Sequence, residues 1–130
     1  MLRKPADVTV LLKPDPRDHF LSDVYAYLEV TDGGHPLKRI MLRQAPLVIG
    51  RSGEHTDYRL DGEGVSRRHV EIVYDEGAYY AKDLGSMNGT LWNGESMVPY
   101  RAYPLQEGDC LTVARTELRF RFVENIRKTV

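Results

Sequence analysis

Apolar and polar residues alternate with a period of two along much of this chain, from about Asp23 onward. Such a period puts successive side chains on opposite faces of a strand, whereas an amphipathic helix repeats about every 3.6 residues. The alternating apolar positions are Val24, Ala26, Leu28 and Val30 in one segment and Leu118, Phe120 and Phe122 in another. This pattern predicts an all-β chain.

Short clusters of turn residues divide the pattern into candidate strands. The cluster at 32–36, Asp-Gly-Gly-His-Pro, is predicted to join strands at 24–31 and 37–42 into a hairpin. Asn93-Gly94 is the pair that a plain two-residue hairpin turn prefers. Further strands are predicted at 47–50, 58–60, 69–74, 78–84, 90–92, 95–98, 110–114 and 117–123. About ten short strands without a helical pattern indicate a β-sandwich.

The length of 130 residues suits one domain with its own hydrophobic core. Residues 1–22 differ in character, because they hold three prolines and the polar run Lys-Pro-Asp-Pro-Arg-Asp at 13–18. We therefore expect an N-terminal tail or extension at 1–22, a folded domain at 23–125 and a C-terminal tail at 126–130.

Charge and cysteine content argue against several classes of function. The formal net charge of -1 at pH 7 disfavours nucleic-acid binding, which normally requires a basic excess. The single cysteine, Cys110, rules out an intramolecular disulfide and a cysteine-rich metal site, and no metal or organic cofactor is expected. The apolar stretch at 8–12 is too short for a signal peptide or a membrane span. No membrane association and a cytoplasmic location are expected.

Three segments place small and polar residues directly beside apolar runs. They are Gly50-Arg51-Ser52, Val65-Ser66-Arg67-Arg68-His69 and Asp83-Leu84-Gly85-Ser86-Met87-Asn88-Gly89-Thr90. The guanidinium of Arg51 can donate two parallel hydrogen bonds to a phosphate, and Ser66 adds a hydroxyl. The amide of Asn88 both donates and accepts, as a peptide backbone requires. If these loops converge, they form a site for an anion on a peptide.

The motifs Gly50-Arg51, Ser66-x-x-His69 and Asn88-Gly89-Thr90, in this order, resemble those of the forkhead-associated (FHA) domain family. Their surroundings agree, because apolar segments precede Gly50 and follow His69, and Gly108-Asp109 precedes a late strand. The resemblance covers roughly residues 24–123. It implies an FHA/SMAD-like two-sheet β-sandwich of about eleven strands, whose end loops bind phosphothreonine peptides.

The resemblance also implies roles for individual residues that bind the peptide. Arg51 matches the arginine that contacts the phosphate, and Ser66 matches the serine that hydrogen-bonds to it. Arg67 matches a position that often adds a phosphate contact. Asn88 matches the asparagine that binds the peptide backbone just after the phosphothreonine.

Other matching positions shape the binding loops. These are Gly50, His69 and Gly89, with His69 bracing the loop that bears the serine. Met87 departs from the best-known members, because it stands where a threonine or serine adds a phosphate contact and lines a pocket for the threonine methyl group. Gly64 lacks the long side chain that some members use to read a peptide residue three positions beyond the phosphothreonine.

The resemblance thus implies a non-catalytic module in Ser/Thr-kinase-dependent signalling. Its partner would be a phosphothreonine-containing protein or peptide, such as a Ser/Thr kinase or its substrate. The main alternative is an FHA-like scaffold that binds partners without reading phosphate. Ser66 and His69 could also suggest a nucleophile and its base, but neither a nucleophile elbow nor an oxyanion motif accompanies them, so no enzyme activity is expected.

The N-terminal extension suggests one form of regulation. Some single-domain members of the family are regulated by a phosphothreonine in their own N-terminal tail, and Thr9 lies in the extension of this chain. A flexible segment of about 14 residues reaches about 20 Å, which permits docking on the same domain. Alternation of Val8 and Val10 around Thr9 favours an extra edge strand over this self-inhibition.

Overall fold

The structure is a computed structural model that describes residues 26–32, 35–43 and 45–123. The predicted tails at 1–22 and 126–130, and with them Thr9, lie outside the described residues. The described part forms two packed β-sheets, with no helix among its elements. The prediction of an all-β, two-sheet sandwich of about eleven strands is confirmed.

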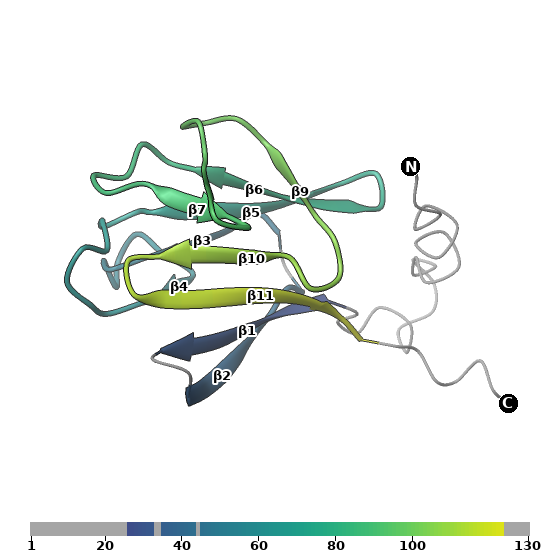
Figure 1. Ribbon diagram of the computed structural model, residues 1–130, viewed down its shortest axis with the longest axis horizontal. Helices are drawn as coiled ribbons and strands as arrows, with labels where there is room; N and C mark the ends of the chain where they lie inside the picture. The colour runs from purple at the N-terminus through teal and green to yellow at the C-terminus, as the bar shows by residue number, and fades with distance from the viewer. Residues whose placement is uncertain (1–25, 33–34, 44, 124–130) are drawn as a thin grey trace, which may run out of the picture.

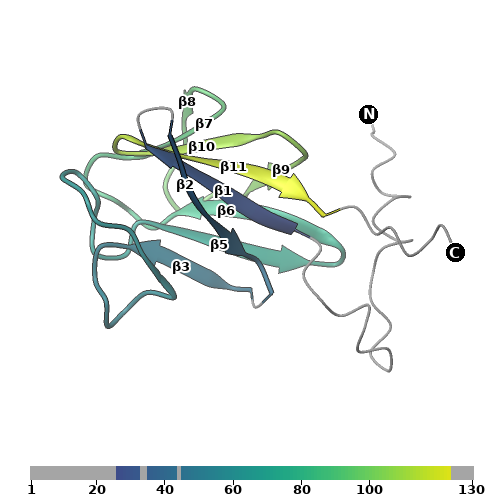
Figure 2. The ribbon, with the colours of Figure 1, turned by 90° about the horizontal axis from the view of Figure 1, so that it is seen from below.

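The first sheet has six strands in the order β2-β1-β11-β10-β7-β8. Its strands are β1 (Ala26–Asp32), β2 (His35–Met41), β7 (Thr90–Trp92), β8 (Glu95–Ser96), β10 (Cys110–Val113) and β11 (Thr116–Phe122). The second sheet has five strands in the order β4-β3-β5-β6-β9. Its strands are β3 (Leu47–Gly50), β4 (Tyr58–Arg59), β5 (Val70–Asp75), β6 (Ala78–Asp83) and β9 (Tyr103–Leu105). Figure 2 shows the layer with β1, β10 and β11 lying over the layer with β3 and β5.

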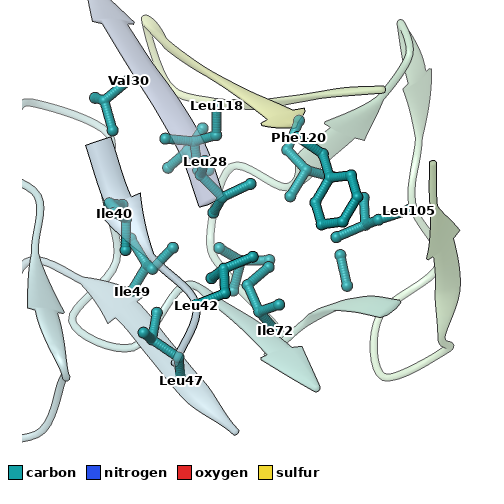
Figure 3. Close-up of a cluster of buried hydrophobic side chains, with 14 of the residues drawn as sticks. Leu28, Val30, Ile40, Leu42, Leu47, Ile49, Ile72, Leu105, Leu118 and Phe120 are labelled. Atoms are coloured by element: carbon teal, nitrogen blue, oxygen red, sulfur yellow. The ribbon is translucent and has the colours of Figure 1, made fainter. Parts of the chain in front are cut away.

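The alternating sequence pattern produces the core between the sheets. Along β1, buried residues alternate with partly exposed ones, and β11 pairs with β1 in antiparallel register, with Leu28 opposite Phe120. Figure 3 shows the side chains of both strands meeting those of the second sheet, among them Ile49 and Ile72. Burial of each such side chain stabilises the fold by about 1.5–3 kcal/mol. The core is therefore made by inward-facing residues of both sheets.

Two hairpin turns have a left-handed backbone at both of their central residues. Asn93 and Gly94 join β7 to β8 with φ angles of 49° and 86°, and Glu76 and Gly77 join β5 to β6 with 47° and 87°. Positive φ at both central residues is the signature of a type I′ turn, whose twist matches that of the flanking strands. The prediction of a plain hairpin turn at Asn93-Gly94 is confirmed.

The strand predictions were wrong at two places, and both contain proline. Strand β9 was not predicted, because it is three residues long and contains Pro104. It lies at the edge of its sheet, where a residue without an N–H is tolerated. Strand β2 starts at His35, inside the predicted turn cluster, and Pro36 pairs with Thr31 beside a shift in register. Strand β2 is also an edge strand.

The sheet order brings the three polar segments to one end of the sandwich. The first segment follows β3, the second lies between β4 and β5, and the third follows β6. Strands β3, β5 and β6 are adjacent to one another in the second sheet. In Figure 1 the corresponding loops gather at the left end, whereas the β5–β6 turn lies at the right.

In the described part of the chain, no helix is long and apolar enough to cross a membrane.

Candidate functional site

The end of β3 lies against the backbone of the serine-bearing loop. The Arg51 N–H donates to the Ser66 carbonyl at 2.9 Å, and the Ser52 N–H donates to the Arg67 carbonyl at 3.2 Å. A Cβ atom at Gly50 would lie 2.2 Å from the Arg67 carbonyl oxygen, a distance that real Cβ atoms do not reach. Glycine at position 50 therefore lets the end of β3 approach the serine-bearing loop closely.

The side chain of Arg51 is exposed, but its orientation is fixed. Its Nε donates a hydrogen bond to the carbonyl oxygen of Val65 at 2.8 Å. A guanidinium has five N–H donors, and the four on the two Nη atoms make no hydrogen bond recorded among the described residues. The Val65 contact thus holds a positively charged fork whose outer donors are available to a ligand.

The hydroxyl of Ser66 connects the second segment to the third. Its Oγ accepts a hydrogen bond from the Met87 N–H at 2.9 Å. Because Oγ is the acceptor there, the hydroxyl proton remains available for donation to a group that only accepts, such as a phosphate oxygen. The side chain of Met87 itself is 86% exposed.

His69 is fully buried and bridges the same two segments through both ring nitrogens. Nδ1 accepts the Ser66 backbone N–H at 3.0 Å, and Nε2 lies 2.9 Å from the carbonyl oxygen of Gly89. Since Nδ1 is an acceptor, the proton of the neutral ring is on Nε2, which donates it to Gly89. The ring therefore fixes the spacing between the loops that carry Ser66 and Asn88.

Asn88 lies at the tip of the third segment, next to a glycine with a left-handed backbone. Gly89 has a φ of +82°, which side-chain-bearing residues rarely adopt. The Nδ2 of Asn88 donates to the carbonyl oxygen of Gly64 at 3.1 Å, so the third segment also contacts the loop after β4. Asn88 is exposed and its carbonyl oxygen faces no partner recorded among the described residues.

Asp83 organises the third segment, although sequence analysis assigned it no role. Its carboxylate is buried and accepts hydrogen bonds from the N–H groups of Gly85 and Ser86 and from the hydroxyls of Ser86 and Thr90. Burial alone would raise the pKa of Asp83, but the hydrogen bonds from Ser86 and Thr90 outweigh it and lower the pKa below its usual value. The sequence signal was an Asp followed closely by Gly-Ser, which is typical of a turn closed by a side-chain carboxylate.

Tyr100 is a second residue that sequence analysis missed. Its hydroxyl donates to the Leu84 carbonyl at 3.0 Å, and its N–H donates to the Asp83 carbonyl at 2.8 Å. A Cβ atom at Gly85 would lie 2.7 Å from the Tyr100 hydroxyl, so the ring packs directly on the start of the segment. No local pattern identified Tyr100, because its contact is made across 16 positions of the chain.

The segments enclose an open groove of about 640 Å³. Its lining brings together four of the five predicted binding residues, and Arg67 is exposed outside the lining. The lining residues are Arg51, Gly62, Glu63, Gly64, Val65, Ser66, Met87 and Asn88. Gly50, His69 and Gly89 are not among the lining residues; Gly50 permits the close approach described above, and His69 contacts the Gly89 carbonyl. The arrangement presents a fixed cation, a hydroxyl donor and an amide to one ligand.

Within the described ranges, no group of three or more His, Cys, Asp or Glu side chains is placed to hold a metal ion.

Comparison with known proteins identifies the family. The family model for the FHA domain matches residues 47–114. The chain is 38% identical over 95 residues to the oxoglutarate dehydrogenase inhibitor of Corynebacterium glutamicum, covering 73% of this chain and 64% of the relative. It is 35% identical over 94 residues to the FHA domain-containing protein FhaA of Mycobacterium tuberculosis, covering 72% of this chain and 17% of the relative. The chain therefore spans less than two thirds of either relative.

A solved structure agrees in fold and in sequence. This structure comes from a structural and functional analysis of phosphothreonine-dependent FHA domain interactions. The likeness has a TM-score of 0.66 at 31% identity and covers 78% of this chain and all of the other. This chain belongs to the FHA domain family.

Proposed function

We propose that this chain is a phosphothreonine-peptide binding module that acts in Ser/Thr-kinase-dependent signalling by recognising a phosphorylated partner. In this proposal Arg51 and Ser66 bind the phosphate, and Asn88 binds the peptide backbone. Arg67 adds a contact from outside the groove lining, and Met87 lies beside the threonine side chain. The partner is a protein such as a Ser/Thr kinase or its substrate.

One observation carries the proposal. Arg51, Ser66 and Asn88 come from three segments that are distant in sequence, and all three line the same groove. A phosphate carries a charge of about -1.5 to -2 at pH 7 and only accepts hydrogen bonds at its oxygens when fully ionised. The oriented Nη groups of Arg51 and the free proton of Ser66 suit such an acceptor. Hydrogen bonds to charged groups contribute about 1.5–3 kcal/mol each.

The family relatives support the same function. The solved FHA domain at 31% identity comes from work on phosphothreonine-dependent interactions. A relative from Corynebacterium glutamicum is named as an inhibitor of an enzyme, which fits a module that acts by binding. We accordingly propose a non-enzymatic role that needs no cofactor, and a cytoplasmic location where Ser/Thr kinases act.

The alternative of a scaffold that ignores phosphate is less well supported. Such a scaffold would have no need for an arginine whose guanidinium is held by Val65 or for a serine hydroxyl held by the next loop. The loop geometry is maintained by a buried His69 that contacts both loops. These contacts favour a function for the groove itself.

A hydrolase based on Ser66 and His69 is disfavoured by geometry. A catalytic base must hydrogen-bond to the hydroxyl that it activates. Here Nδ1 of His69 accepts the backbone N–H of Ser66, and Nε2 donates to Gly89. Both ring nitrogens are therefore engaged by backbone groups, and the Ser66 hydroxyl contacts Met87 instead.

An oriented peptide library tests the proposal. Matched sets containing phosphothreonine, phosphoserine or unmodified threonine at the fixed position would be titrated against the chain. We expect binding of the phosphothreonine set and loss of most binding in the unmodified set, since the phosphate supplies the charged contacts. Equal binding of phosphorylated and unmodified sets would favour the scaffold alternative.

A further inference from the structure

The groove contains a second charged side chain in addition to Arg51. Among the lining residues only Arg51 and Glu63 carry a formal charge at neutral pH, and their charges are opposite. A phosphate is attracted to the guanidinium and repelled by the carboxylate. The groove is therefore electrostatically polarised, and a ligand that fits it should be polarised in the opposite sense.

Glu63 belongs to a turn that is held on both sides. The Val65 N–H donates to the Gly62 carbonyl at 3.3 Å, and Gly64 has a φ of +91°. A positive φ at the third residue is typical of a type II turn, which places Glu63 second. The Gly64 carbonyl also accepts the hydrogen bond from Asn88. The backbone that carries Glu63 is thus tied to the loop of the peptide-binding asparagine.

The other carboxylates of nearby loops have partners, whereas Glu63 has none recorded. Asp61 pairs with Arg59 at 3.0 Å, and Glu54 lies 3.8 Å from a ring nitrogen of His55. No ion pair found among the described residues includes Glu63, which is exposed. Because Gly62 and Gly64 flank it, Glu63 carries the only side chain among the lining residues 62–64.

We propose that Glu63 is a specificity-determining residue that selects phosphothreonine peptides with a lysine or arginine flanking the phosphothreonine. The inference rests on the proposed function, since it requires the phosphate to occupy the end of the groove near Arg51 and Ser66. A basic side chain of the same peptide then lies against Glu63. The carboxylate also disfavours peptides whose flanking residues are acidic.

The test uses one phosphothreonine peptide with alanine at all flanking positions. Each flanking position is replaced in turn by lysine or by glutamate, and dissociation constants are measured by fluorescence anisotropy at low ionic strength. At one position we expect lysine to bind about two- to five-fold more tightly than alanine, as exposed charge pairs do. Glu63→Gln should remove this preference, and Glu63→Lys should reverse it in favour of glutamate.

The control is Glu76→Lys, which changes the net charge equally at an exposed position in the β5–β6 turn. It should leave the ratio of lysine to glutamate affinities as in the wild type. A lysine preference that survives in Glu63→Lys, or equal affinities at every position, would overturn the inference while phosphate-dependent binding stands. If the parent peptide binds no better than its unphosphorylated form, the proposed function itself fails.

Discussion

At the scale of single residues, Arg51, Ser66 and Asn88 each have one polar atom held by the protein and another left for a ligand. The Nε of Arg51 is used by Val65 while its Nη groups are not, and the Oγ of Ser66 accepts from Met87 but keeps its proton. Fixing the side chains before binding lowers the entropy that association costs. The loops thus present a preorganised set of donors.

Met87 gives a prediction about selectivity. The family resemblance places Met87 where the best-known members have a threonine or serine, and its side chain is exposed at the groove. We expect phosphothreonine to bind about fourfold more tightly than phosphoserine, because burying one methyl group contributes about 0.8 kcal/mol. Met87→Thr should strengthen phosphothreonine binding by supplying a hydroxyl donor.

Calorimetric titration of matched phosphothreonine and phosphoserine peptides measures both effects. Identical affinities for the two peptides would show that the groove offers the threonine methyl no contact.

At the scale of elements, the site depends on the close approach of β3 to the loop before β5. Replacing Gly50 by alanine would force its Cβ into the Arg67 carbonyl, a backbone atom that cannot rotate away. We expect Gly50→Ala to destabilise the fold by about 3 kcal/mol. Denaturant unfolding followed by Trp92 fluorescence measures the loss.

Gly53→Ala, in the loop that follows β3, is the matched control. Its Cβ would come no closer than 3.8 Å to another group, and no positive φ is present. Its stability should equal that of the wild type or exceed it by about 0.4–1 kcal/mol, since alanine restricts the unfolded chain. Equal loss of stability in both variants would contradict the steric explanation for Gly50.

The segment after β6 gives a pH-dependent prediction. The folded protein lowers the pKa of Asp83 below its unfolded value of about 3.9, so the unfolded chain takes up the proton first as the pH falls. The stabilising contribution of Asp83 is therefore fully present above about pH 5 and is lost as the pH falls through the folded pKa.

Asp83→Asn separates this contribution from those of other carboxylates. Wild type should be more stable than Asp83→Asn by about 2 kcal/mol or more at pH 7, because the carboxylate accepts four hydrogen bonds. The difference should shrink as the pH falls from 5 toward 3. Asp75→Asn, at an exposed position, serves as the control. A difference that is constant over this pH range would refute the assignment.

At the scale of the whole molecule, the sequence was sufficient to predict the features of the fold that depend on local residue patterns. Alternation of apolar residues along β1 and β11 predicted the sandwich. Asn93-Gly94 predicted a hairpin turn, because both residues tolerate a positive φ. Strand β9 could not be predicted, since its pairing with β6 compensates for a short segment with an internal proline. Such an edge strand is specified by its neighbour and not by its own residues.

The site shows the same division between local and long-range information. The motif order allowed Arg51, Ser66 and Asn88 to be named, but their convergence required the family resemblance. The contributions of Asp83 and Tyr100 were missed because these residues act through hydrogen bonds to the backbone of the loop. Glu63 was also missed, since its place in the groove depends on how the turn at 62–65 is attached to Asn88.

In the proposed function, Arg51 is the main phosphate-binding residue of the groove. The most direct measurement is calorimetric titration of one phosphothreonine peptide and its unphosphorylated form against wild type, Arg51→Ala and Arg43→Ala. Arg43 is an exposed arginine before β3, so it controls for lost positive charge. We predict that Arg51→Ala stays folded and binds the phosphopeptide about tenfold more weakly or worse, while Arg43→Ala binds as wild type does. Unchanged affinity in folded Arg51→Ala would contradict the account.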